Sequence, residues 1–376
     1  MLSRRLHTIL PSTKLHAKIR FIGRRSIFAT NLNQNHNNPL GLPKNNTRIP
    51  PQIPRKGPIG GGLPPKQKIP NVKHVVLVSS CKGGIGKSTI SVNLAVSLSL
   101  LNLSQLRRLR VGILDLDVFG PSVPTLMGLR GVEEPGLMKT GALIPITNHG
   151  IPTMSMAYLL PPSQGVSSEG DAEPTNEDTP VVWRGLMVQK AVQQLLFQTD
   201  WSAFEGGQSG GPGLDVLVVD LPPGTGDIPL SVSQLVDVNS TIIITTADIL
   251  SLSDVRRGVA MFQKLEMPIT GLVVNNSYFI CENDGCGMKH HLYGHDINNN
   301  QSGFHKGVRA MGLGGNKIVG ELPLVADVGR GAERGIPYAL GGVNQTVGAG
   351  KLWKDAMKGV AERVWAEIVS VGERRM

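Results

Sequence analysis

Residues 74–89 decide the fold of this chain and read His-Val-Val-Leu-Val-Ser-Ser-Cys-Lys-Gly-Gly-Ile-Gly-Lys-Ser-Thr. The first half is an apolar, β-branched run of strand length, and the second half is a glycine-rich turn that enters a helical pattern. In such a turn successive backbone N–H groups can point into one concavity, and the positive N-terminus of the following helix adds to its attraction for phosphate. The segment therefore predicts a strand, a phosphate-binding loop and a helix, in that order.

The residues of this loop have separate expected roles. The glycines supply backbone freedom, Lys87 would reach the β and γ phosphates of a nucleotide, and the Ser88 hydroxyl would ligate Mg²⁺. The strict pattern G-x-x-x-x-G-K-[ST] has glycine where this chain has Cys81, which we interpret as a small residue tolerated at a turn, with a sensor thiol as the alternative. The predicted nucleotide-binding residues of the loop are Gly83, Gly84, Ile85, Gly86, Lys87, Ser88 and Thr89.

Strand-length apolar runs alternate with helical periods along the rest of the chain. Such runs are typical of strands buried on both faces of a parallel sheet. The expected strands are residues 74–80, 111–116, 215–220, 240–245 and 269–275, and the expected helices include 87–101, 186–196 and 251–265. This order predicts an α/β domain at residues 71–376 with a doubly wound, mostly parallel sheet.

Acidic residues stand where two of the expected strands end. Asp220 closes one strand and precedes a Pro/Gly run, and a carboxylate in this position beside the loop strand can hold Mg²⁺ through a water. Asp115 and Asp117 stand at the end of another strand, where one of them can orient an attacking water. We favour Asp117 for this role.

Two of the three cysteines, Cys281 and Cys286, lie close together after the strand at 269–275. Thiolates are soft ligands suited to iron–sulfur clusters or zinc, and one pair is half of a four-thiolate site. A symmetric dimer would bring two pairs together at its axis. The alternatives are a single-chain zinc site that adds His290 and His291, and an inert or redox-switching thiol pair.

The net charge suggests a basic protein, but the distribution of charge along the chain excludes this interpretation for the folded domain. The net charge of the 376 residues is +10, but no Asp or Glu precedes Asp115, and residues 1–30 carry seven Lys and Arg among Leu, Ile, Phe and Ser. This composition predicts a mitochondrial presequence at residues 1–30, followed by a Pro/Gly/Asn-rich linker at 31–70 that is too polar and broken to pack. The remaining domain is slightly acidic, so we expect no nucleic-acid partner.

The assembled motifs resemble one family, the Mrp/ApbC group of deviant-Walker P-loop ATPases that carry or assemble iron–sulfur clusters. The resemblance runs from about residue 71 to the C-terminus. It rests on residues 82–89, 115–122, 182–185, 220–227 and 275–286. It implies a P-loop NTPase fold of the MinD/Mrp type and a homodimer with ATP between its subunits.

The resemblance also implies a role for individual residues. Lys82 is similar to the signature lysine that contacts nucleotide across the interface, and Lys87 to the P-loop lysine. Asp117 corresponds to the acid that supports hydrolysis, Asp220 to the Walker B acid, and Asn275 to a base-recognition residue.

The cysteines resemble the family's pair that bridges a labile 4Fe-4S cluster between protomers. Four residues separate Cys281 from Cys286, whereas the family has two, so this loop is longer. The implied function is an ATP-dependent cluster scaffold and carrier of the mitochondrial matrix with slow ATP hydrolysis. Its clients would be apo iron–sulfur proteins, and with a mitochondrial presequence these would be subunits of respiratory complex I.

Two other functions remain open at this point. A positioning ATPase of the MinD/ParA type would bind a membrane or DNA, and an apolar stripe on the expected helix at 352–369 could contact the inner membrane. Such a stripe is more often core. It consists of Trp353, Met357, Val360, Val364 and Ile368. The third function is a metal-free regulatory nucleotide switch.

Overall fold

The structure is a computed structural model. It describes residues 66–374 except 105–106, 119, 132–133, 160–184, 204–209, 282, 284–285, 295–301, 314–316 and 342–347. The predicted presequence and all but the last residues of the predicted linker lie outside the described residues, as does most of the motif at 182–185.

A mostly parallel sheet forms the centre of the described domain. Eight described strands follow the order β12-β9-β8-β1-β7-β4-β6-β5, and β5 alone among them pairs antiparallel, with β6. The strands are β1 (Val72–Ser80), β4 (Val111–Asp115), β5 (Ile146–Asn148), β6 (Ile151–Ser155), β7 (Leu214–Asp220), β8 (Ser240–Thr245), β9 (Ile269–Val274) and β12 (Ile318–Glu321). The predicted fold class is therefore confirmed.

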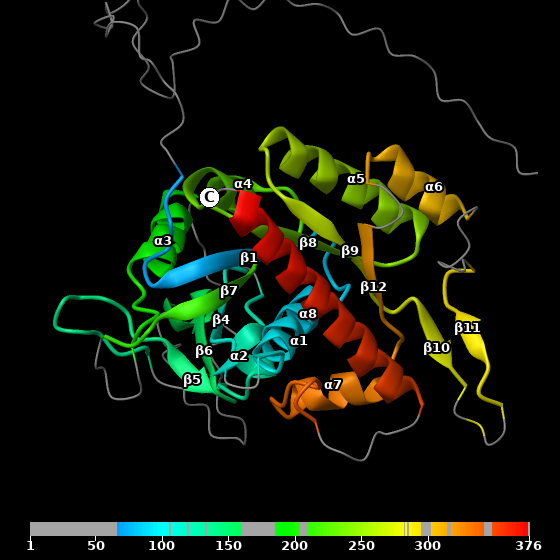
Figure 1. The fold of residues 1–376 in the computed structure, drawn as a ribbon, viewed down its shortest axis with the longest axis horizontal. Helices are drawn as coiled ribbons and strands as arrows, with labels where there is room; N and C mark the ends of the chain where they lie inside the picture. The colour runs from blue at the N-terminus through cyan, green and yellow to red at the C-terminus, as the bar shows by residue number, and fades with distance from the viewer. Residues whose placement is uncertain are drawn as a thin grey trace, which may run out of the picture. The chain divides into compact units, whose positions relative to one another are not determined.

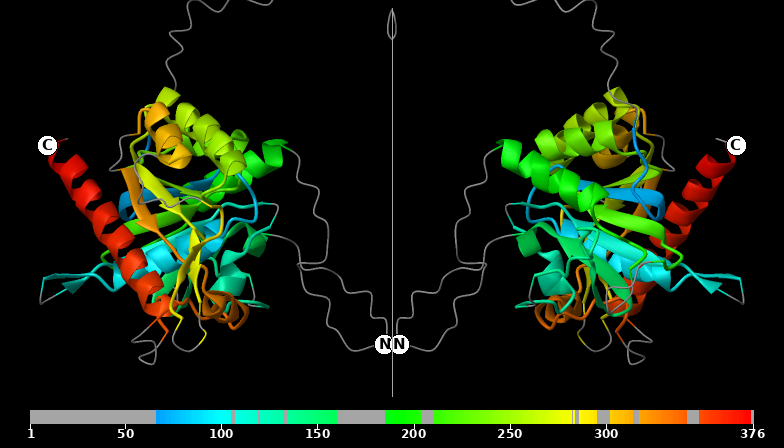
Figure 2. Two further views of the ribbon diagram at one scale, coloured as in Figure 1. Left: turned by 90° about the vertical axis from the view of Figure 1, so that its right-hand side faces the viewer. Right: turned by 90° about the vertical axis from the view of Figure 1, so that its left-hand side faces the viewer.

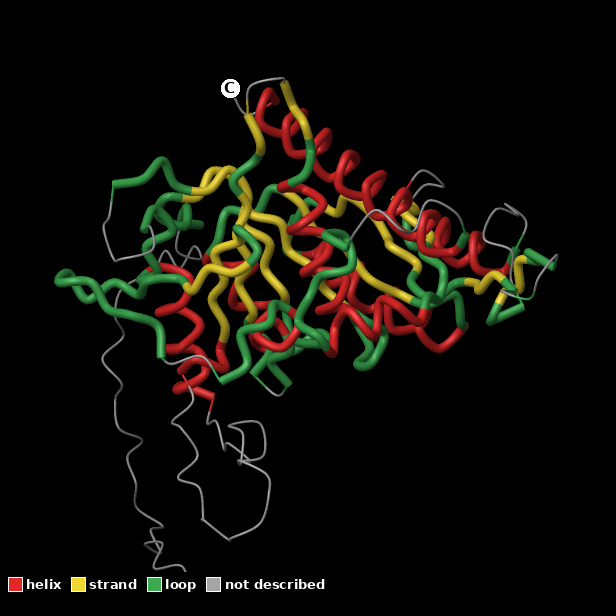
Figure 3. Tube along the Cα trace, turned by 90° about the horizontal axis from the view of Figure 1, so that it is seen from below, coloured by secondary structure: helices red, strands yellow, loops and turns green. Residues whose placement is uncertain are grey.

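Helices cover both faces of this sheet, as Figures 1 and 3 show. One face carries α1 (Lys87–Ser99), α2 (Val123–Leu126), α7 (Ala326–Glu333) and α8 (Ala349–Arg374). The other carries α3 (Gly185–Phe197), α4 (Asp227–Leu235), α5 (Ile249–Lys264) and α6 (Gly303–Ala310). Seen from the side, α8 and α5 lie on opposite sides of the sheet (Figure 2).

The central strand β1 explains why its sequence is continuously apolar. Val75 and Leu77 belong to the hydrophobic cluster on the α5 face, whereas Val76 and Val78 belong to the cluster on the α8 face. Successive side chains of a strand point to opposite faces, so a strand covered on both sides must be apolar at every position.

The apolar stripe of α8 is part of the core. Trp353, Met357, Val360, Val364 and Ile368 are buried, and the Trp353 ring meets the Tyr338 ring edge to face with centroids 5.2 Å apart. A Cβ on Gly320 of β12 would lie 2.3 Å from Val360 Cγ2, so helix and strand are in close contact. In the folded domain this stripe is therefore not available to a membrane surface. Among the described residues, no helix combines the length and the hydrophobicity that a bilayer span needs.

Several elements were not predicted. Besides β5, β6 and β12, the described chain contains the 3-10 helix η1 (Met156–Leu159) and the two-stranded ribbons β2 (Asn102–Ser104) with β3 (Arg107–Arg108) and β10 (Tyr278–Ile280) with β11 (Lys289–His291). The cysteine segment lies between the two strands of the β10–β11 hairpin.

Candidate functional site

Parallel pairing brings the predicted acids to the end of the loop strand. Within the sheet β7 lies between β1 and β4, with Val78 opposite Asp220 and Asp220 opposite Asp115. All three strands point the same way, so the phosphate loop and both carboxylates gather at the carboxyl edge of the sheet, where doubly wound proteins bind ligands.

The phosphate loop has the backbone that its glycines permit. Gly84 and Gly86 have φ of 76° and 87°, and α1 begins at Lys87 directly after them. A Cβ on Gly83 or Gly84 would meet no atom within 4 Å, so the space beside this turn is free of protein atoms. At Gly86, by contrast, a larger residue would clash, because its Cβ would lie 2.5 Å from Asn275 Nδ2. This loop therefore fits a polyphosphate held by backbone N–H groups.

Asp220 is the centre of the polar network below the loop. Its buried carboxylate receives Lys87 Nζ at 2.7 Å and the Ser88 hydroxyl at 2.6 Å on Oδ2, and the Ser91 hydroxyl at 2.6 Å on Oδ1. Lys87 is also buried and lies 3.6 Å from Asp117 Oδ2. Ser91 was not singled out in the sequence, although it follows Lys87 by four positions and hence lies on the same side of α1.

The two acids after β4 have different surroundings. The Asp115 carboxylate accepts hydrogen bonds from Asp117 N at 3.0 Å, Val123 N at 3.2 Å and the Ser155 hydroxyl at 3.1 Å. Burial, with the nearby charge of Asp220, raises the pKa of Asp115 to about 7. Asp115 thus shapes the turn that carries Asp117, whereas Asp117 lies beside Lys87. Of the two acids, Asp117 is therefore the one beside the lysine of the phosphate loop.

Lys82 and Cys81 lie at the entrance of the loop, towards α5. Lys82 is exposed, and its charge is felt at Asp248, the N-cap of α5. Although burial opposes it, hydrogen bonds from Ser251 and Thr246 lower the pKa of Asp248 to about 2. Burial raises the pKa of Cys81 to about 11, and its Sγ lies 2.2 Å from the position that a Cβ on Gly258 would take. A protonated, packed thiol supports the interpretation as a turn residue over the sensor.

Asn275 touches the phosphate loop directly. It follows β9, and its Nδ2 donates to the Ile85 carbonyl at 2.8 Å while its backbone N–H donates to Thr245 O at 2.7 Å. The side chain therefore supports the loop backbone. The contact with a nucleotide base that the resemblance implied stays a prediction.

The cysteine segment closes the β10–β11 hairpin. Cys281 is partly buried, Cys286 is exposed, and both are free thiols. The Cys281 N–H donates to Met288 O at 2.9 Å, which extends the hairpin ladder to the first cysteine. The hairpin projects from the β12 end of the sheet in Figure 1.

The zinc alternative does not fit this hairpin. His290 and His291 are successive residues of β11, so their side chains point to opposite faces, and the His290 ring stacks on Phe279 at 4.9 Å. Within the described ranges no group of three or more His, Cys, Asp and Glu side chains gathers to hold a metal ion.

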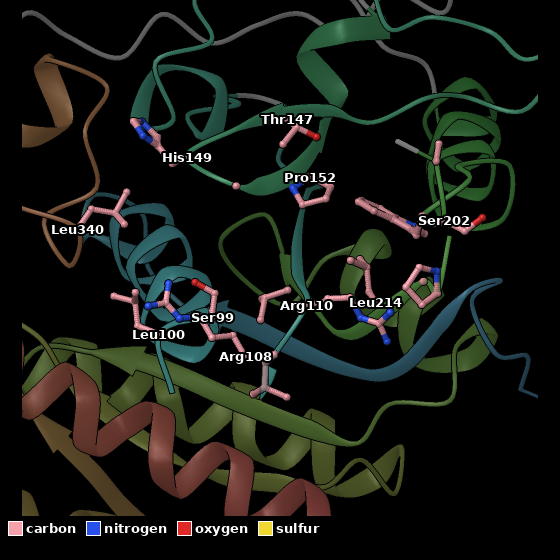
Figure 4. Close-up of a pocket in the computed structure, with 17 residues that line it drawn as sticks. Ser99, Leu100, Arg108, Arg110, Thr147, His149, Pro152, Ser202, Leu214 and Leu340 are labelled. Carbon is pink, nitrogen blue, oxygen red and sulfur yellow. The ribbon is translucent and has the colours of Figure 1, made fainter. Parts of the chain in front are cut away.

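A large cavity lies elsewhere. It measures about 660 Å³ and is bounded by the start of β4, the start of β7 and the end of α1, with Arg108, Arg110, His149 and Leu214 among its walls (Figure 4). The phosphate loop lies at the opposite, carboxyl edge of the same strands. The cavity is therefore distinct from the nucleotide site, and none of the predicted site residues lines it.

Fold and site together define a P-loop NTPase, in which a central strand, a glycine loop and a buried lysine–aspartate pair form the phosphate site. The chain belongs to the family described as "ParA: NUBPL iron-transfer P-loop NTPase", which it matches over residues 71–361. This membership favours iron transfer over the positioning ATPase.

Relatives and solved structures agree with this assignment. The chain is 37% identical to the "Iron-sulfur cluster transfer protein NUBPL" of Dictyostelium discoideum, over 82% of each chain. It is 33% identical to the Arabidopsis thaliana "Iron-sulfur protein required for NADH dehydrogenase, mitochondrial", over 80% of this chain and 82% of that one. A nucleotide-binding protein of Archaeoglobus fulgidus, solved with ADP, is 27% identical with a TM-score of 0.53 and covers 72% of this chain and 89% of its own.

Proposed function

We propose that this protein is an ATP-binding carrier that assembles an iron–sulfur cluster and transfers it to mitochondrial apoproteins. The observation that carries the proposal is a pair of free thiols on a hairpin that begins three residues after Asn275, the side chain in contact with the phosphate loop. The segment that carries both thiols therefore starts from a residue in contact with the phosphate loop.

The phosphate site would bind Mg-ATP. Lys87 would pair with the β and γ phosphates, and the oxygens of Ser88 and Asp220 are the hard ligands that Mg²⁺ prefers, Asp220 through a water. For this to happen Lys87 must leave Asp220 and turn towards the phosphates. Asp117 would then orient the attacking water, and Lys82, exposed at the loop entrance, would reach the nucleotide of a second subunit. We expect slow hydrolysis, because the nucleotide acts as a switch between conformations.

The cargo would be a 4Fe-4S cluster shared by two chains. Four thiolates normally hold such a cluster, and Cys281 with Cys286 supplies two. A homodimer agrees with the exposed apolar side chains at the carboxyl edge of the sheet. Leu230 lies in the first turn of α4, and Ile249 and Leu250 begin α5, with exposed fractions of 74% and 71% for the latter two.

The compartment and the clients follow from the presequence and the relatives. The composition of residues 1–30 favours import into the mitochondrial matrix. One relative bears the name of a protein required for mitochondrial NADH dehydrogenase, and this name supports complex I subunits as the recipients.

Anaerobic reconstitution with iron and sulfide tests the proposal. The wild-type chain should bind roughly two iron atoms per chain with the absorbance and EPR signals of a 4Fe-4S cluster, and Cys281→Ala with Cys286→Ala should bind none. Cys81→Ala is the matched control and should retain the cluster, because its thiol packs against α5. A wild-type chain without iron, or a double variant that keeps it, would remove cluster transfer from the function.

A further inference from the structure

The cysteine hairpin is joined to the phosphate loop by a very short connection. Asn275 holds the Ile85 carbonyl through its side chain, and Tyr278, the first residue of β10, is three positions further on. Between them Asn276 adopts a left-handed backbone with φ of 49°. Only this short turn therefore separates the residue that contacts the loop backbone at Ile85 from the first strand of the hairpin.

Ser277 fixes the end of this turn to the edge of the sheet. It is fully buried, its N–H donates to Leu322 O at 3.0 Å, and its hydroxyl donates to Glu321 Oε1 at 2.8 Å. Its carbonyl accepts the N–H of Leu292, just beyond β11, at 3.2 Å. Ser277 thus connects the turn, the end of β12 and both sides of the hairpin.

Glu321 reaches the hairpin a second time through Lys289. Lys289 Nζ lies 3.5 Å from Glu321 Oε1 and 3.7 Å from the centre of the Tyr278 ring, so a single ammonium bridges β12, β10 and β11. The side chains of Lys289 and Glu321 are 34% and 16% exposed, which shields this ion pair in part from solvent. In the ladder Lys289 pairs with Ile280, the residue that precedes Cys281.

We propose that Glu321 is a positioning residue that transmits the state of the phosphate loop to Cys281 and Cys286. Nucleotide binding shifts the Ile85–Gly86 backbone and therefore Asn275, and Glu321 keeps Ser277 and Lys289 together so that the hairpin moves with this turn as one body. Without Glu321 the hairpin is attached at its base but no longer braced on its β11 side. The inference rests on the proposed function, since it assigns how nucleotide governs the thiols that hold the cargo.

The test measures thiol accessibility in the cluster-free protein. The rates of alkylation of Cys281 and Cys286 by iodoacetamide are followed by peptide mass spectrometry, with and without Mg²⁺ and a non-hydrolysable ATP analogue. In the wild type the nucleotide should change the rates about fivefold or more, as expected for a coupled pair of sites. In Glu321→Ala this ratio should fall close to one, while the affinity for the analogue stays within about twofold of wild type.

Two further variants separate this role from a general loss of structure. Glu362→Ala removes an exposed carboxylate that pairs with Lys358 on α8 and should keep the wild-type ratio. Lys289→Met keeps an apolar chain over Tyr278 but removes the charge, and it should also lower the ratio; it decides the matter should Glu321→Ala fail to fold. The inference is overturned if Glu321→Ala keeps the wild-type ratio of alkylation rates with and without nucleotide. If Glu321→Ala does not fold, a wild-type ratio in Lys289→Met has the same meaning. The inference is also overturned if nucleotide does not change the alkylation rates of the wild type.

The same proteins distinguish failure of the inference from failure of the proposed function. If nucleotide controls alkylation through Glu321 but no chain binds a cluster on reconstitution, the positioning role stands and the carrier function falls. If the wild type binds a cluster and Glu321→Ala still answers nucleotide fully, the carrier function stands and the positioning role is wrong.

Discussion

At the scale of single residues, the phosphate site depends on the balance between Lys87 and Asp220. Both are buried, the exposed fractions being 6% and 0%, and the carboxylate has this ammonium and two serine hydroxyls as partners. Removal of one member of a buried ion pair leaves the other charge uncompensated, which is strongly destabilising.

We therefore predict that Lys87→Met lowers the free energy of unfolding of the nucleotide-free domain by about 3 kcal/mol or more. Adding Asp220→Asn should restore part of this loss, because the amide carries no charge that needs a partner. Urea unfolding of the two variants and the wild type measures the difference. Equal stabilities of the single and double variants would show that the buried charge is not the cause.

Asp115 gives a second prediction, on pH. Because burial raises its pKa from 3.8 to about 7, the folded protein favours the protonated acid, and its contribution to stability is fully present below pH 3.8 and is lost as the pH rises to about 7. The stability of the wild type relative to Asp115→Asn should consequently fall between pH 5 and pH 7, as measured by urea unfolding at each pH. Asp327→Asn, which replaces an exposed carboxylate, serves as control. A relative stability that rises over this window would contradict the assignment.

At the scale of elements, the phosphate loop packs closely against Asn275, the residue that follows β9. Gly86 has φ of 87°, and a Cβ there would lie 2.5 Å from Asn275 Nδ2. Gly224 has a similar φ of 93° but no atom within 4 Å of its Cβ position. Alanine substitutions at the two glycines therefore distinguish the cost of backbone strain, which both would have, from the cost of a steric clash, which only Gly86 would have.

Gly86→Ala should lower the free energy of unfolding by about 2 kcal/mol and weaken nucleotide binding, whereas Gly224→Ala should show only the smaller effect of its backbone. Asn275→Ala, combined with Gly86→Ala, should remove the clash, so the two substitutions will not be additive. Denaturant unfolding and calorimetric titration with nucleotide give both quantities. Additive losses would mean that the contact with Asn275 is unimportant.

The same elements explain which parts of the fold were predictable. The strands β1, β7, β8 and β9 are covered on both faces, so each shows a continuous apolar run in the sequence. β6 was missed because it contains Pro152, which normally argues against an inner strand, and β12 because it has four residues with a glycine among them. Their pairing is set by neighbouring strands rather than by local pattern.

The site was predictable where one short segment carries it. The loop at 83–89 and the strand-end acids follow from local sequence, and the sheet order brings them together. The contacts of Ser91 with Asp220 and of Glu321 with Ser277 and Lys289 join segments up to 129 residues apart. The position of Ser91 four residues after Lys87 is a local signal for the first contact, whereas Glu321 has none. In the segment at 277–291 the thiols could be recognised from the sequence, but the hairpin that carries them could not.

At the scale of the whole molecule, the exposed Ile249 and Leu250 predict where two copies meet. We expect Ile249→Asp with Leu250→Asp to abolish ATP-dependent dimerisation in analytical ultracentrifugation while leaving the unfolding transition unchanged within about 0.5 kcal/mol, because both side chains already face solvent. Leu352→Asp, on the outer side of α8, should dimerise normally. A double variant that still dimerises with ATP would place the contact on another surface.

The two borders of the sheet bear on how this chain avoids aggregation. An open border offers unpaired backbone groups to any extended strand, and short or irregular border strands reduce that risk. Here β5 has three residues and β12 four, and the pairing of β12 with β9 shifts register between Ile318 and Gly320. Neither border presents a long regular ladder, so strand addition between copies is disfavoured even at high protein concentration. The proposed self-association would then use the surface at the carboxyl edge, where a bound nucleotide could control it.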